Sequence, residues 1–215
     1  MKRLIDTTLP WLALITLGLL TGCASKPYDY TNYRACPPRS ILVLPPLNNT
    51  TDMGATYGYL STVSFPIAER GYYVFPVAVV DQVMKENGLP TAGEMQQVSL
   101  QKIHEIIGAN AVLYTTITQY GSKYQVLSST TMVAAEGRLV DVKTGTVLWV
   151  GKVNLSQGTS SGNLLVDLVA TPFEQAINQS TDQAHGLCVG ANAVLFNTKD
   201  HGLLTGPYFP QDQKP

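Results

Sequence analysis

The sequence predicts an α/β (α+β) domain in which a mixed β-sheet carries helices mainly on one face. Three observations favour this class. A short apolar run at residues 40–45 is followed by segments whose apolar residues have helical spacing. Residues 111–155 then change to stretches rich in Val, Thr, Leu and Tyr, as expected for an antiparallel meander. A helical pattern returns at residues 163–179, so that helices can cover the sheet.

The first elements alternate between strands and helices. The apolar run at 40–45 ends in a proline pair and predicts a buried strand. Apolar side chains at helical spacing predict a helix at 56–70, and Gly71 suits its end. Tyr72-Tyr73-Val74-Phe75 predicts a second strand.

Two further helices are expected before the meander. The first covers residues 77–87 and ends at Gly88. The second follows Ser99, which is a good helix cap, and it ends at Gly108.

The second half is expected to hold three antiparallel strands and a last helix. The strands are predicted at 111–119, 124–142 and 146–155, and Lys143-Thr144-Gly145 forms the second turn. An apolar stripe predicts the last helix at 163–179, and the chain after His185 shows no clear period. The complete predicted order is β-α-β-α-α-β-β-β-α.

The amino terminus has the three parts of an export signal. Lys2 and Arg3 are basic, residues 9–20 are apolar, and Leu20-Thr21-Gly22-Cys23 follows. The apolar stretch is shorter than the ~20 residues that a membrane-spanning helix needs. The last four residues resemble a bacterial lipobox, which predicts lipidation of Cys23. The alternative is an ordinary signal peptide that happens to contain a cysteine.

These features predict four regions along the chain. Residues 1–22 are the signal peptide and residues 23–39 a lipidated tether, rich in Pro, Tyr and polar residues. Residues 40–183 form the α/β domain, and residues 184–215 form an irregular tail on or beside it. Ala24 and Ser25 follow the cysteine, and by resemblance to enterobacterial sorting rules the absence of Asp at the second position predicts the outer membrane. The sequence leaves open whether the domain is periplasmic or exposed at the cell surface.

Two cysteines remain after Cys23, namely Cys36 and Cys188. Because exported proteins enter an oxidising compartment, we expect a disulfide between them. The alternative is two buried thiols.

Composition argues against nucleic acid as a partner. The net charge of −1 offers no basic face of the kind that phosphate backbones require. Only 13% of the residues are charged, against a typical 25%, and there are eleven tyrosines. A soluble domain so poor in charge often hides part of its surface against a partner.

The search for catalytic motifs predicts no enzyme, no metal and no cofactor. His104-Glu105-Ile106-Ile107-Gly108 begins like a zinc-protease helix, but Gly108 stands where the second histidine is required. Ser99-Leu100-Gln101-Lys102, Lys143-Thr144-Gly145 and Ser161-Gly162-Asn163 match elements of penicillin-binding enzymes in the wrong order. We interpret Ser99 as a helix cap and Thr144-Gly145 as turn residues.

Two stretches carry family resemblances. Residues 71–77, with Glu86-Asn87-Gly88-Leu89 soon after, are similar to a family of bacterial lipoproteins known as a surface-lipoprotein antigen and domain of unknown function. Residues 108–114 and 139–149 resemble the core pattern of the curli-secretion lipoprotein CsgG and of the TolB amino-terminal domain. This chain has Asn110 where that pattern has Asp. The resemblance implies a TolB-N/CsgG-like α/β binding domain without a catalytic set.

The sequence therefore favours a non-enzymatic outer-membrane lipoprotein that is an accessory in an envelope secretion or assembly complex, with a partner of CsgG type. The alternative is a periplasmic hydrolase or ligand-binding protein whose site forms from scattered residues. Tyrosine suits interfaces because it buries area and still offers a hydroxyl group. We expect an interface, including possible self-association into a homo-oligomer, at Tyr57, Tyr59 and Tyr72, beside the tyrosines of the tether. These are Tyr28, Tyr30 and Tyr33.

Overall fold

The computed structural model describes residues 28–125, 128–158, 164–165 and 183–210. Its elements are α2 (Thr31–Ala35), β1 (Ser40–Val43), β2 (Leu47–Asn48), α3 (Ala55–Glu69), β3 (Tyr73–Val74), α4 (Val77–Glu86), α5 (Ala92–Met95), α6 (Leu100–Ile106), β4 (Ala111–Gln125), β5 (Ser128–Asp141), β6 (Val147–Gly158), β7 (Leu164–Leu165) and α8 (Gln183–Asn197). The strands and helices that the sequence predicts between residues 40 and 158 are present, with the bounds just given. The elements α2, β2, α5, β7 and α8 were not predicted.

The sheet is mixed, which confirms the predicted fold class. Its strand order is β3-β1-β4-β5-β6-β7, and β2 also pairs with β4. The pairs among β1, β2, β3 and β4 are parallel, whereas β4, β5, β6 and β7 form an antiparallel meander. The β5–β6 turn has the expected chemistry, because Asp141 accepts the Thr144 N–H at 2.8 Å and Gly145 adopts a φ of 71°.

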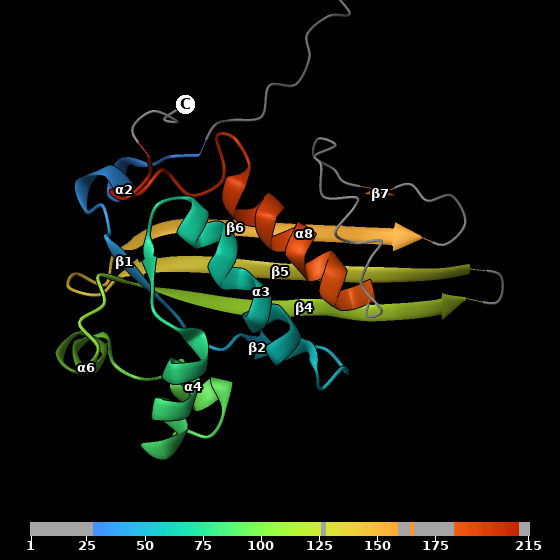
Figure 1. The fold of residues 1–215 in the computed structure, drawn as a ribbon, viewed down its shortest axis with the longest axis horizontal. Helices are drawn as coiled ribbons and strands as arrows, with labels where there is room; N and C mark the ends of the chain where they lie inside the picture. Colours follow the sequence, from blue (N-terminus) through green and yellow to red (C-terminus); the bar gives the residue numbers. More distant parts are fainter. Residues whose placement is uncertain (1–27, 126–127, 159–163, 166–182, 211–215) are drawn as a thin grey trace, which may run out of the picture.

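Two hydrophobic clusters lie on opposite faces of the sheet. Along β1, Ile41 and Val43 belong to the cluster that includes the buried residues of α3 and α8. Leu42 and Leu44 belong to a second cluster with Met84 of α4, Met95 of α5 and Ile103 of α6. Since alternate side chains of a strand point to opposite faces, α3 and α8 cover one face and α4–α6 cover the other face near β1. Figure 1 shows the two long helices crossing β4–β6, with α4 and α6 at one end of the sheet.

The predicted tether of residues 23–39 is wrong for the residues that the structure describes. Residues 31–35 form α2, and the side chain of Tyr33 is only 2% exposed. The N–H of Tyr28 donates to the Asp200 carbonyl at 3.1 Å. The segment of residues 28–39, which we call the amino-terminal arm, is therefore attached to the rest of the domain from residue 28 onward. The folded domain therefore begins about twelve residues earlier than residue 40, because aromatic side chains of the arm fill part of the core.

The predicted irregular tail at 184–215 is also wrong, because Gln183–Asn197 forms α8. Ten of its residues are buried, and it packs against α3 and the sheet. The helix expected at 163–179 falls mostly outside the described residues. Leu164 and Leu165 are described, and they form strand β7 against β6 rather than the start of a helix.

The predicted disulfide between Cys36 and Cys188 is not present. Cys36 follows α2 at the surface end of the arm, where it is partly exposed. Cys188 is completely buried in α8, in the core cluster that also contains Tyr59. Both cysteines lie at the same hydrophobic cluster, with Cys188 inside it and Cys36 packed against its edge, but they are not bonded to each other in the structure.

Candidate interaction surface

The three tyrosines expected at an interface have different environments. The exposed fraction of the side chain is 51% for Tyr57, 0% for Tyr59 and 5% for Tyr72. Tyr57 and Tyr59 are two residues apart on α3, and this spacing places them on different sides of the helix. Tyr59 and Tyr72 are core residues, so only Tyr57 remains available to a partner.

The tyrosines of the arm hold the two ends of the described chain together. Tyr33 and Tyr72 have hydroxyl oxygens 2.6 Å apart, and Tyr72 donates to the Leu204 carbonyl at 2.6 Å. Tyr30 donates to the Gly202 carbonyl at 2.5 Å. Desolvation by burial raises the pKa of Tyr30, of Tyr33 and of Tyr72, the last to about 12. These side chains are structural and do not form a docking surface.

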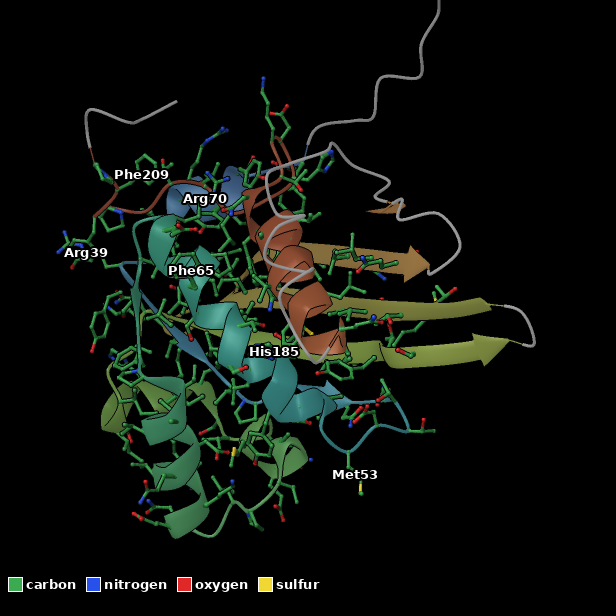
Figure 2. All side chains as sticks on the ribbon, turned by 45° about the vertical axis from the view of Figure 1, so that its right-hand side comes forward. Arg39, Met53, Phe65, Arg70, His185 and Phe209 are labelled. Atoms are coloured by element: carbon green, nitrogen blue, oxygen red, sulfur yellow. The ribbon has the colours of Figure 1, made fainter. Side chains whose placement is uncertain are left out.

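The outer side of α3 carries an aromatic ridge, which we define as Tyr57 and Phe65. The two residues are eight positions apart, about 80° around the helix axis, and both are exposed. Phe65 is 67% exposed, and Figure 2 shows it on the outer side of α3. The Lys85 ammonium donates to the Tyr57 hydroxyl at 2.8 Å and lies 5.0 Å from its ring centre, which connects the ridge with α4.

A groove of about 780 Å³ lies between α4, α5 and α6. Its apolar lining residues are Val83, Met84, Leu89, Val98, Ile103, Ile106 and Ile107, and its polar rim includes Glu94, Lys102 and Glu105. Ile106 is 75% exposed and Val83 is 39% exposed, while Val79, one helical turn before Val83, is 57% exposed. We call this the α4–α6 groove.

Local sequence explains why these helices form a groove. Val80 and Met84 bury one side of α4, while Val79 and Val83 remain on its outer side. The helix ends before Gly88, whose φ of 81° is the left-handed conformation that glycine readily adopts. The connections between the short helices leave an apolar space that no other described element fills.

Side-chain caps fix the positions of α5 and α6. Thr91 and Glu94 form a capping box at the start of α5. Ser99 accepts the Lys102 N–H at 3.4 Å, which confirms that Ser99 is a helix cap. Gln96 then ties the end of α5 to the sheet, because its amide donates to the carbonyls of Pro45 and Thr115 at 2.9 and 3.1 Å.

Sequence reasoning missed the α4–α6 groove, although α4 carries a signal for it. Residues 77–84 have valines at four positions, more than a single buried stripe requires. The pair Ile106-Ile107 at the end of α6 is a second signal, because the side chains of consecutive helical residues diverge.

The zinc-protease motif does not form a metal site within the described part of the chain. His104 and Glu105 are exposed on α6, where Gln101 donates to Glu105 at 2.8 Å. Over the same residues, no group of three or more His, Cys, Asp or Glu side chains is placed to hold a metal. Ser161-Gly162-Asn163 lies outside the described residues.

A smaller polar hollow of about 280 Å³ lies where the arm meets the β5–β6 turn. Asn110 is its organising residue, because its side-chain oxygen accepts the N–H groups of Arg39 and Ser40 and the Ser40 hydroxyl, each at 3.2 Å. An aspartate carboxylate at position 110 could accept the same hydrogen bonds. The change from Asp in the CsgG and TolB pattern to Asn110 here therefore keeps these contacts. The hydrogen bonds of Asn110 thus fasten the chain around Arg39 and Ser40 to the start of β4.

The described helices include none that is both long and apolar enough to cross a membrane. Cys23, the predicted lipidation site, lies before residue 28 and outside the described residues.

The fold is a small α+β domain similar to that of a solved lipoprotein. The chain belongs to the family described as "Putative lipoprotein GNA1162-like", whose model matches residues 28–208. It is 40% identical over 208 residues to "Putative lipoprotein NMB1124/NMB1162" of Neisseria meningitidis serogroup B, covering 94% of this chain and 97% of that protein. The match covers 94% of this chain, which is more than residues 28–215 could supply alone. The similarity therefore also includes part of the segment before residue 28.

The chain is also similar to solved structures. The crystal structure of lipoprotein GNA1162 from Neisseria meningitidis is 46% identical and has a TM-score of 0.55, over 59% of this chain and 88% of that one. A PelC dodecamer from Paraburkholderia phytofirmans is 12% identical with a TM-score of 0.45, over 79% and 90% of the respective chains. Since lipoproteins carry a lipid anchor, family membership indicates that this chain is attached to a membrane of the cell envelope.

Proposed function

We propose that this protein is a non-enzymatic lipoprotein of the outer membrane that binds another envelope protein through the α4–α6 groove. The observation that carries the proposal is the exposure of Val79, Val83 and Ile106 beside an apolar groove. Contiguous apolar surface on a soluble domain commonly marks a binding site. The aromatic ridge on α3 is a separate exposed surface, because Lys85, which it contacts, is two residues from Val83 and projects from the opposite side of α4.

The groove suits an apolar protein segment better than a reaction. Its described lining contains neither histidine nor cysteine, and its charged residues Glu94, Lys102 and Glu105 lie among apolar side chains. An amphipathic helix placed in such a groove buries its apolar face while its polar face stays in water. Binding would be weak in dilute solution but effective between two proteins attached to the same membrane, because tethering raises the effective concentration.

The sequence supports the outer membrane and the type of partner in this proposal. Cys23 is the proposed lipid attachment site, and Ala24 and Ser25 after it suit outer-membrane sorting. The resemblance of residues 108–114 and 139–149 to CsgG makes an envelope lipoprotein of that type the first partner to test. A second copy of this chain is the other protein that the test can detect.

Photo-crosslinking in living cells tests the proposal. A photoreactive amino acid at Val83 or Ile106 should give a protein adduct of defined mass. The matched control is Val150, which is 40% exposed on β6 against 39% for Val83 on α4. Adducts at both groove positions and none at Val150 support the proposal. Equal yields at all three positions, or no adduct from an abundant lipidated protein, contradict it.

A small apolar ligand is the second candidate for the groove. The volume of about 780 Å³ falls in the range of about 300–1,000 Å³ that is usual for ligand pockets. Native mass spectrometry of the protein purified from membranes separates the two candidates. A bound small molecule that is lost on Ile106→Asp substitution would favour the ligand, whereas a protein adduct from the groove favours a protein partner.

A further inference from the structure

We infer that the end of the domain around α2, the first residues of β6 and residues 198–201 lies against the lipid headgroups, and that the α4–α6 groove points away from the membrane. This inference rests on the proposed lipid anchor at Cys23. It depends on how Tyr28 is fixed to the domain and on how few residues separate Tyr28 from Cys23.

The arm is fixed to the domain from its first described residue. The N–H of Tyr28 donates to the Asp200 carbonyl at 3.1 Å, and the Tyr28 hydroxyl accepts the Val150 N–H at 3.0 Å. The rings of Tyr28 and Tyr30 have centres 4.8 Å apart, and Tyr30 in turn donates to Gly202. Tyr28 is therefore held at two edges, on β6 and on the segment after α8.

The chain between the anchor and Tyr28 is short. Cys23 precedes Tyr28 by five residues, so that even a fully extended chain spans only about 17 Å. A tether of seventeen residues, as the sequence alone predicts, would reach about three times farther and leave the domain free to turn. The short connection keeps the surface around Tyr28 next to the headgroup region.

The side chains of this surface suit the water beside a bilayer rather than its interior. Asp29, Arg34, Lys199 and Asp200 are exposed and carry both signs of charge. Such a balanced surface is not repelled by headgroups, and these four described residues do not form the lysine and arginine cluster that would bind anionic lipid by itself. Tether length therefore sets the orientation.

The groove lies at the other end of the domain. Both views place α2 at one end and α4 at the opposite end, with the sheet between them (Figures 1 and 2). A partner that uses the groove must then project far enough from the membrane to reach it. This condition fits a folded domain or a loop of an envelope protein and excludes a lipid-embedded helix.

Spin labels on two exposed lysine positions test the inference in the full lipidated chain. The substitutions Lys199→Cys, near Tyr28, and Lys102→Cys, at the groove, are compared in a Cys36→Ser, Cys188→Ala background. Acylated Cys23 is a thioether and does not react with the label. The protein is placed in phosphatidylcholine vesicles that contain a nickel-chelating headgroup lipid, and paramagnetic relaxation of each label is measured.

Relaxation should be several-fold stronger at position 199 than at position 102. An insertion of twelve Gly and Ser residues after Ser25 lengthens the tether by about 20 Å and should make the two positions alike. Equal relaxation without the insertion, or a difference that survives it, overturns the inference. Absence of an acyl mass on the peptide that contains Cys23 overturns the anchor and this orientation together, whereas failure of the groove crosslinks leaves the orientation intact.

Discussion

The Tyr33 hydroxyl donates a hydrogen bond to the Tyr72 hydroxyl at 2.6 Å, and the Tyr72 hydroxyl in turn donates one to the Leu204 carbonyl. This chain of two hydrogen bonds joins the amino-terminal arm, the β3 region and the segment after α8. It shows that residues which the sequence predicts to form a tether and a tail are parts of one folded domain.

Substitution of two buried tyrosines should have opposite effects. Tyr72→Phe removes the bond to Leu204 and leaves the Tyr33 hydroxyl without its acceptor, so that unfolding free energy should fall by about 1–3 kcal/mol. Tyr59→Phe should leave stability unchanged or raise it by up to about 1 kcal/mol, because the buried Tyr59 hydroxyl has no hydrogen-bond partner among the described residues. Urea denaturation of both variants measures the difference. Equal losses would contradict the assigned network.

Alkaline pH should destabilise the domain. Burial raises the pKa of Tyr72 to about 12, and it also raises the pKa of Tyr33 and of Tyr59. In the unfolded chain these groups lose their protons near pH 10, whereas the folded chain keeps them. Stability is therefore constant below about pH 10 and falls as pH rises above it, by about 2–3 kcal/mol from Tyr72 alone up to pH 12. A free energy of unfolding that stays level from pH 9 to pH 11.5 would contradict the burial of these tyrosines.

Two glycines with the same backbone conformation test the packing of the last described segment. Gly71 has a φ of 83°, and an added Cβ would meet the backbone of Phe209. Gly88 has a φ of 81°, but open space surrounds its Cβ position. Gly88→Ala should thus cost only the left-handed strain, about 1 kcal/mol, and Gly71→Ala about 3 kcal/mol or more. Similar losses in thermal denaturation would show that the segment around Phe209 does not pack on α3.

Sequence reasoning predicted the meander and the helices α3, α4 and α6 because their patterns are local. The strands β4–β6 alternate apolar and polar side chains over long stretches, and Thr144-Gly145 marks the turn between two of them. The four-residue helix α5 was missed, although Thr91 and Glu94 have the spacing of a capping box.

The missed helix α8 has a physical explanation. It is buried on nearly every side, between α3 and the sheet, and small residues such as Gly186, Gly190 and Ala191 allow the close approach. A helix buried all round has no polar face and therefore no apolar stripe to detect. Helix propensity does not predict α8 either, because its glycines are poor helix formers.

The placement of the tyrosines could not be predicted from composition. Tyr57 and Tyr59 are close in sequence, but the geometry of α3 places Tyr57 in solvent and Tyr59 in the core. Tyr30 and Tyr33 are buried by contacts with residues far along the chain, around Gly202 and Leu204. The groove likewise depends on how three short helices meet, which no local pattern specifies.

The most direct test of the account is whether one charge in the α4–α6 groove abolishes partner binding. A photoreactive residue at Val79 reports the partner, and Val83→Asp is compared with the matched exposed substitution Val150→Asp in the same background. Thermal denaturation confirms that both variants are folded. We predict that the protein adduct from position 79 disappears with Val83→Asp and persists with Val150→Asp. An adduct that survives Val83→Asp in a folded, lipidated protein would contradict the groove as the binding site.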